Sequence, residues 1–145
     1  MKKHFRNLII LAALLCFNFG YSWGTTGHRV IAEIAQNHLT GKAQRHLKKI
    51  IGDQRLAYWA NWPDFIKADT TGVWKETEQW HYVNVEPQSN LESFTQNLKA
   101  QKAPNIYTQI KILSDQIKDK NTSSKDREIA LRFLIHLVGD SSQPL

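Results

Sequence analysis

A histidine and a carboxylate four positions apart are the most informative residues near the C-terminal end of the chain. They begin and end the segment His136-Leu-Val-Gly-Asp140, and on a helix positions i and i+4 lie on one face. This face continues the apolar stripe of Ile129 and Phe133, where an unpartnered carboxylate is costly. An imidazole nitrogen and a carboxylate oxygen one turn apart are good zinc ligands. The alternative is a hydrogen bond that holds His136 at the helix end, and the pair alone fits this alternative better.

A second candidate lies in the segment Trp23-Gly24-Thr25-Thr26-Gly27-His28. If a leader ends directly before Trp23, this residue carries a free α-amino group, whose unperturbed pKa of about 8 makes it easier to deprotonate than lysine. The amine and the carbonyl oxygen of the same residue can chelate a metal ion. Gly24 and Gly27 let the backbone turn so that His28 reaches that ion. The alternative makes Trp23 a core anchor and His28 an ordinary residue of a helix N-terminus.

Asp64 and His81 lie in aromatic stretches, Ala60-Asn-Trp-Pro-Asp-Phe-Ile66 and Trp80-His-Tyr-Val-Asn84. Each has a simpler alternative role. Asp64 would place a negative charge at a helix N-terminus, and His81 would be a core histidine with satisfied hydrogen bonds. Taken together, however, the candidates are two carboxylates, three histidines and a terminal amine. Such a set of nitrogen and oxygen ligands suits several zinc ions.

The N-terminal segment has the pattern of a secretion signal. Three basic residues precede ten apolar residues at 8–17, whereas a membrane-spanning helix needs about 20. Gly20 and Ser22 form a small-x-small pattern that is typical of a cleavage site. We therefore expect residues 1–22 to be a signal peptide and residues 23–145 to form one secreted or periplasmic domain. The alternative is an N-terminal membrane anchor.

The composition of the mature part limits its net charge and the types of metal ligand that it can offer. The leader holds three of the 19 basic residues and none of the 13 acidic ones. The mature part therefore has 16 basic and 13 acidic residues and a net charge of +3. A charge this small does not by itself indicate nucleic-acid binding. The single cysteine, Cys16, leaves with the leader, so the mature chain has neither a disulfide nor a thiolate ligand. Nitrogen and oxygen atoms must then hold any zinc ion.

The hydrophobic pattern of the mature region predicts an all-α fold. Apolar residues recur at helical spacing, and no stretch alternates long enough for a sheet strand. Pro63 interrupts one apolar stretch, with Asn61 as the expected helix cap. Residues 68–80 lack periodicity and are expected to form a loop, followed by a short extended segment at 81–85. Helices are predicted over residues 27–39, 42–51, 91–100, 105–119 and 125–138. The apolar stretch at 56–66 is expected to break, or to start a new helix, at Pro63.

In their order and spacing, the candidate residues resemble the zinc-dependent single-strand nucleases of the S1/P1 type, within the superfamily that includes bacterial zinc phospholipase C. The resemblance covers the whole mature chain and implies the multi-helix fold of that superfamily. It lies in a combination of motifs: Trp-Gly at 23–24 with His28 five residues on, Trp-x-Asp ending at Asp64, His-Tyr-x-Asn at 81–84, and His-x3-Asp at 136–140 followed by Gln-Pro-Leu.

The resemblance implies a ligand scheme for two zinc ions. It assigns six metal ligands: Trp23, His28, Asp64, His81, His136 and Asp140. The first two of these would bind one ion, with Trp23 contributing its amino nitrogen and its carbonyl oxygen. The next three would bind a second ion, and Asp140 would bridge the two ions.

A third zinc ion of the family depends on residues that come later in the sequence. It needs a histidine directly after Gln-Pro-Leu, followed by a further histidine and an aspartate. The chain ends at Leu145, one residue before the first of these ligands. Because family members are usually longer, we expect residues 23–145 to be the N-terminal part of a nuclease domain.

The implied function is hydrolysis of single-stranded DNA or RNA by a secreted endonuclease, which leaves 5′-phosphates and also removes terminal 3′-phosphates from nucleotides. The nucleophile would be a hydroxide held by zinc, so no catalytic side chain is needed beyond the ligands. Tyr82 would stack on a base or, alternatively, pack in the core. Asn84 would bind the phosphate or orient His81. No protein partner is inferred, nor is a stable membrane association after leader cleavage.

Two other functions remain open at this point. A zinc phospholipase C would use the same metal scaffold on a lipid head group. The short gap between Trp23 and His28 favours the nuclease, because the phospholipases place more residues there. A catalytically inactive zinc-binding fragment is the second alternative, and the absence of the third zinc ion's ligands favours it.

Overall fold

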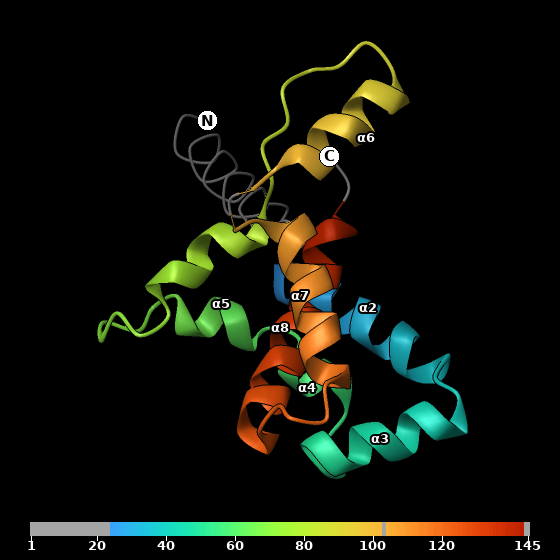
Figure 1. The fold of residues 1–145 in the computed structure, drawn as a ribbon. Helices are drawn as coiled ribbons and strands as arrows, with labels where there is room; N and C mark the ends of the chain where they lie inside the picture. The colour runs from blue at the N-terminus through green and yellow to red at the C-terminus, as the bar shows by residue number, and fades with distance from the viewer. Residues whose placement is uncertain (1–23, 103, 144–145) are drawn as a thin grey trace, which may run out of the picture.

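The structure is a computed structural model that describes residues 24–102 and 104–143. The predicted leader, its cleavage site and Trp23 lie outside the described residues. Over the described part the regular elements are all helices and no strand forms (Figure 1), which confirms the predicted all-α class. The elements are α2 (Gly24–Asn37), α3 (Gly41–Ile51), α4 (Leu56–Trp59), α5 (Trp62–Ile66), the 3-10 helix η2 (Lys75–His81), α6 (Leu91–Ala100), α7 (Ile106–Lys118) and α8 (Ser124–Ser141).

Most helices begin and end close to their predicted bounds. Helix α6 spans the predicted residues 91–100. Helix α7 begins after Asn105, whose side chain accepts a hydrogen bond from the amide of Thr108 at 3.0 Å, as expected of an N-terminal cap. Helix α8 begins after the capping residue Ser123 and continues beyond the predicted end at 138 to Ser141. Asp140 therefore lies on the same helix as the residues one turn before it.

The break predicted at Pro63 within residues 56–66 is confirmed, because this stretch forms two short helices, α4 and α5. Pro63 has no amide hydrogen, so one continuous ladder of hydrogen bonds cannot run through it. Asn61 occupies the N-cap position of α5 but does not cap it with its side chain. Its Nδ2 atom donates to the carbonyl oxygen of Thr25 at 3.1 Å. This bond ties the junction between α4 and α5 to the first turn of α2.

The loop predicted over 68–80 is wrong for its second half, where residues 75–81 form η2. Aromatic packing and one buried threonine stabilise this short helix. The hydroxyl of Thr77, which is 2% exposed, donates to the carbonyl of Trp74 at 2.7 Å. His81 is the last residue of η2 rather than the first of an extended segment, and the backbone becomes extended at Tyr82.

Helix α8 lies at the centre of the molecule, alongside α7 and in contact with α2, α3, α4 and α5 (Figure 1). Its residues belong to two buried clusters. The cluster that α8 forms with α2, α3 and α4 contains Ala32, Ile51, Leu56, Ala57, Ala60 and Leu131. The cluster that it forms with α7 contains Ile106, Leu113, Ala130, Phe133 and Leu137, with Trp62, Trp74 and Trp80 around Phe133.

Helix α6 differs from the others because it buries none of its residues. Within residues 24–102 and 104–143, no helix combines the length and the apolar character that crossing a bilayer requires.

Candidate metal centre

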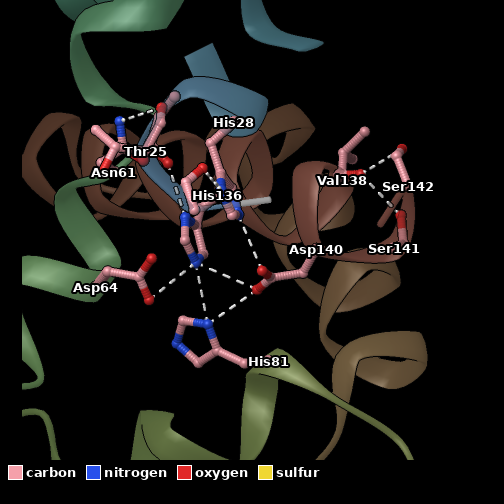
Figure 2. Close-up of polar contacts among 12 residues, drawn as sticks. Thr25, His28, Asn61, Asp64, His81, His136, Val138, Asp140, Ser141 and Ser142 are labelled. Carbon is pink, nitrogen blue, oxygen red and sulfur yellow. Dashed lines mark hydrogen bonds and ion pairs between the residues drawn. The ribbon is translucent and has the colours of Figure 1, made fainter. Parts of the chain in front are cut away.

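Five of the six predicted ligands converge on one site at the centre of the molecule (Figure 2). They come from four elements that are distant in sequence. Helix α2 provides His28, α5 provides Asp64, η2 provides His81, and α8 provides both His136 and Asp140. The sixth predicted ligand, Trp23, directly precedes the first described residue of α2.

His136 lies in the middle of the cluster and is fully buried. Its Nε2 atom lies 3.0 Å from Nδ1 of His81, 3.2 Å from Oδ2 of Asp140 and 3.5 Å from Oδ1 of Asp64. The contact between His136 and Asp140 is the one that a purely structural helix-end pair would make. Here, however, that pair is part of a larger group of converging donor atoms.

Asp140 uses its two oxygen atoms for different partners. Oδ1 lies 2.9 Å from Nε2 of His28, and Oδ2 lies 2.9 Å from Nδ1 of His81. The side chain is only 14% exposed. This carboxylate therefore connects the N-terminal helix of the described chain to η2, as a group that bridges two cations would have to do.

The donor atoms are close enough to hold metal ions. In two sets of three residues, all the ligand atoms lie within 4.8 Å of one another. One set is His28, Asp64 and His136, and the other is His81, His136 and Asp140. His136 belongs to both sets, so the atoms form one compact cluster. How they divide between two ions stays a prediction of the family resemblance.

Backbone carbonyls fix the direction of two imidazole rings. Nδ1 of His136 donates to the carbonyl oxygen of Ala60 at 2.7 Å, and Nδ1 of His28 donates to that of Gly24 at 3.0 Å. A carbonyl oxygen can only accept, so each ring carries a proton on Nδ1, and its Nε2 atom is directed at the cluster. Metal-binding histidines in proteins are usually oriented in this way. Sequence reasoning missed both carbonyls, because a carbonyl group leaves no signal in residue type.

His81 faces the cluster with its other nitrogen. Its Nδ1 atom contacts Asp140 and His136, whereas its Nε2 atom is buried without a hydrogen-bond partner in the part of the chain that the structure describes. A histidine that used Nδ1 as a ligand would keep its proton on Nε2. The ring is therefore turned with its potential ligand atom inward.

The charges in the metal-free cluster are strongly coupled. Burial alone would lower the pKa of His136, but its hydrogen bonds with Asp140 and Asp64 outweigh this effect and raise the pKa to about 9. Burial likewise works to raise the pKa of Asp140, but hydrogen bonds from three histidines hold that pKa far below its usual range. The carboxylates of Asp64 and Asp140 would thus stabilise a positive charge placed between them.

The pKa of Asp64 is also held far below its ordinary value. The main cause is the hydrogen bond with His136, and a second contribution comes from Lys67. Nζ of Lys67 lies 2.7 Å from Oδ1 of Asp64. Asp64 lies in the first turn of α5, so its alternative role at a helix N-terminus is compatible with its place in the cluster. Sequence reasoning did not single out Lys67, which follows Asp64 by three positions.

Gly139 allows α2 and α8 to approach each other closely at the cluster. A Cβ atom built on Gly139 would lie 2.6 Å from Cδ2 of His28, which is shorter than any normal contact. Sequence reasoning quoted this glycine within His-x3-Asp but gave it no role. The available signal was a glycine inside a helix, where it costs about 1 kcal/mol relative to alanine and so often has a packing reason.

The two predicted substrate-binding residues lie on the surface beside the cluster. Tyr82 is 54% exposed, so the alternative that it packs in the core is wrong. Tyr82 and Asn84 line a shallow hollow together with Gln101, Pro104 and Asn105. The hydrogen bonds of the His81 ring go to other residues, so Asn84 does not orient it.

The regular elements of the described residues are all helices, and histidines and aspartates from four of them form one cluster. The molecule is therefore a helical protein with a candidate multi-metal centre. Comparison with known families places it further: the model of the S1/P1 Nuclease family matches residues 23–145. The chain belongs to this family.

Individual relatives are distant in sequence. Nuclease P1 of Penicillium citrinum is 28% identical over 128 residues, which cover 85% of this chain and 46% of the relative. Nuclease S1 of Aspergillus oryzae is 26% identical over 147 residues, which cover 94% and 48%. Endonuclease 4 of Arabidopsis thaliana is 26% identical over 156 residues, which cover 100% and 51%. The chain therefore spans about half the length of these relatives.

Proposed function

We propose that this chain provides the N-terminal metal centre of a secreted, zinc-dependent phosphodiesterase that cleaves single-stranded nucleic acid. The observation that carries the proposal is the convergence of His28, Asp64, His81, His136 and Asp140 from four separate elements. Family membership and relatives named as nucleases support the reaction class. The leader pattern at 1–22 supports secretion or export to a periplasm.

The donor set fits zinc. It offers imidazole nitrogens and carboxylate oxygens, and two of the imidazoles are held by carbonyls with Nε2 directed at the site. In the proposed scheme, Trp23 and His28 hold one ion, a second is held by Asp64, His81 and His136, and Asp140 bridges them. Zinc ions so held supply Lewis acidity and lower the pKa of water toward neutrality. The family's third zinc position needs residues after Leu145.

The surrounding residues fit a nucleic-acid substrate. Lys67 lies beside Asp64 and places a positive charge where a phosphate would approach the metal centre. Tyr82 follows His81 directly and exposes its ring, so a base next to the scissile phosphate can stack on it. Such stacking contributes about 1–3 kcal/mol per base and tolerates any sequence. Since a paired base cannot reach the ring, single strands are preferred.

The products proposed from the family resemblance carry 5′-phosphates, with removal of terminal 3′-phosphates as a second activity. Asn84, on the rim of the same hollow as Tyr82, is proposed to bind the phosphate or the sugar. Both residues are separate from the metal ligands. Their substitution should therefore change substrate affinity without removing zinc.

The test uses the mature chain that begins at Trp23. Zinc content is measured by mass spectrometry of the metal, and hydrolysis is measured on single-stranded DNA, duplex DNA, RNA and phosphatidylcholine vesicles. We expect tightly bound zinc and cleavage of single strands in preference to duplex. Hydrolysis of phosphatidylcholine with single-stranded DNA left intact would make the protein a phospholipase. Bound zinc with no hydrolysis of any substrate would make it a binding module.

A further inference from the structure

Arg132 lies on α8, one turn before His136, and its guanidinium is packed between two indole rings. Its Cζ atom lies 3.4 Å from the centroid of Trp59 and 5.1 Å from that of Trp62. The side chain is only 17% exposed and also pairs with Glu128 on the same helix. The Glu128 carboxylate and the two aromatic faces therefore hold this arginine, the latter in the manner of a cation–π contact.

The two indoles enclose the segment that orients the central histidine. Trp59 ends α4 and Trp62 begins α5, so the guanidinium connects the two sides of the junction formed by Ala60 and Asn61. The carbonyl of Ala60 accepts the Nδ1 proton of His136 at 2.7 Å. Arg132 thus fixes the α4–α5 junction, and the Ala60 carbonyl of this junction orients the ring of His136, which lies one turn after Arg132 on α8.

The same junction places a carboxylate. Asp64 follows Trp62 by two positions in α5, and its Oδ1 atom lies 3.5 Å from Nε2 of His136. Trp62 is in turn packed edge-on against Phe133 and Trp74, at centroid distances of 5.5 and 5.3 Å. A shift of Trp62 would therefore be transmitted to Asp64 as well as to the Ala60 carbonyl.

The arginine contact is tight but incompletely hydrogen-bonded. Nε of Arg132 and Nε1 of Trp59 are both buried, and neither has a hydrogen-bond partner among the residues that the structure describes. Leaving buried donors without partners is unfavourable. The contact of the guanidinium with the faces of Trp59 and Trp62 uses a planar shape that a lysine ammonium cannot reproduce.

We propose that Arg132 is a positioning residue of the metal centre. It clamps Trp59 and Trp62 around the α4–α5 junction, which keeps the Ala60 carbonyl on Nδ1 of His136 and leaves Nε2 of that ring available as a ligand. This inference rests on the proposed zinc site. It extends that site outward to an arginine that is not one of the proposed ligands.

The test compares Arg132→Lys with Arg127→Lys in the mature chain. Arg127 is a matched control, because it also lies on α8 but bonds to the carbonyls of Asp119 and Thr122 rather than to tryptophans. Zinc affinity is measured by competition with a chelator under conditions where each variant is folded. We expect Arg132→Lys to weaken zinc binding roughly 10-fold or more, in the range of outer-sphere substitutions, and Arg127→Lys to leave it unchanged.

A second readout separates positioning from general stability. In nitrogen-15 NMR spectra, the Nδ1 proton of His136 should be observable and slow to exchange in the wild type, and should exchange faster in Arg132→Lys. A variant that melts at a lower temperature but keeps both the zinc affinity and the slow Nδ1 proton would overturn the proposal. If Arg132→Lys does not fold, Trp59→Phe serves instead, and it should weaken zinc binding by a smaller factor.

The two proposals fail in different ways. If the wild-type chain binds no zinc, the proposed function is wrong, while the exchange rate of the Nδ1 proton in the metal-free protein still tests the clamp. If the wild type binds zinc and Arg132→Lys binds it equally well, the clamp is wrong and the metal centre stands.

Discussion

The imidazole ring of His28 lies flat on that of His136, with a centroid distance of 4.1 Å and an angle of 8° between the ring planes. The two Nε2 atoms contact different oxygens of Asp140, at 2.9 Å for His28 and 3.2 Å for His136. One carboxylate therefore serves both rings of a stacked pair.

The stacked pair should depend on the absence of a side chain at position 139. In Gly139→Ala, the new methyl group would lie 2.6 Å from Cδ2 of His28, so the ring or α2 must move. We expect a loss of about 1–3 kcal/mol in the free energy of unfolding, as for other overpacked sites, together with weaker zinc binding. Thermal unfolding and zinc titration measure the two effects. Gly41→Ala, whose nearest contact would be an ordinary 3.6 Å, should neither destabilise the fold nor weaken zinc binding.

Asp140→Asn tests the proposed bridge. An amide keeps the shape of the carboxylate but cannot supply a negative charge to two ions, so both zinc ions of the proposed scheme should be lost. The measurement is the molar ratio of zinc to protein after dialysis. Asp115→Asn is the control, since Asp115 is an exposed aspartate on α7, and it should keep the wild-type ratio. A near-normal zinc content in Asp140→Asn would remove the bridging role.

The metal-free protein should lose stability as the pH rises. The pKa of His136 is raised from 6.5 to about 9, while Asp64, Asp140, His81 and His28 face it. Because this folded-state pKa lies above the unfolded value, its contribution is fully present below pH 6.5 and disappears as the pH rises through about 9. For the two aspartates, whose pKa values are lowered from 3.8, the contribution is present above about pH 4 and is lost in acid.

Calorimetry of the chelator-treated protein should therefore give a maximal Tm between about pH 4 and 6.5. Zinc should reverse the trend at higher pH, because the ion replaces the proton on Nε2 of His136 and its affinity rises as that proton becomes easier to remove. An apoprotein whose Tm stays constant from about pH 6.5 to 9 would contradict the charged state assigned to His136.

The proposed N-terminal ligand can be tested by extending the chain. A protein with one residue retained before Trp23 has no free amine at that position. We expect it to lose affinity at one zinc position only, because His28, Asp140 and the remaining cluster stay in place. Stepwise zinc titration of the extended and the unextended proteins resolves the two positions. Identical titrations would show that the amine is not a ligand.

The sequence allowed prediction of the candidate ligands that converge in the structure, but not of the atoms that orient them. Residue type and spacing identify His136 and Asp140 as neighbours on one helix, and the structure places them together. The family resemblance then selects Asp64 and His81, which no local pattern distinguishes from a helix-end charge or a core histidine. The carbonyl of Ala60 could not be predicted, because it depends on how α4 ends.

The errors in the predicted fold have physical causes. Helical periodicity needs several turns to become visible, so η2 was predicted as a loop. Packing of Trp74 and Trp80 against Phe133 stabilises this segment, which is too short to be read from periodicity alone. Arg132 was likewise overlooked, because an arginine on a helix looks solvent-exposed until two indoles are found to cover it.

The contact between His28 and Asp140 joins positions that are 112 residues apart. An ion held by both residues would link two segments that lie close to the two ends of the described chain. The single cysteine of the sequence falls within the predicted leader. A disulfide persists after unfolding, whereas such a link exists only while the native structure lasts and strengthens with the concentration of free metal. The resistance of this protein to unfolding would then follow the zinc concentration of its surroundings.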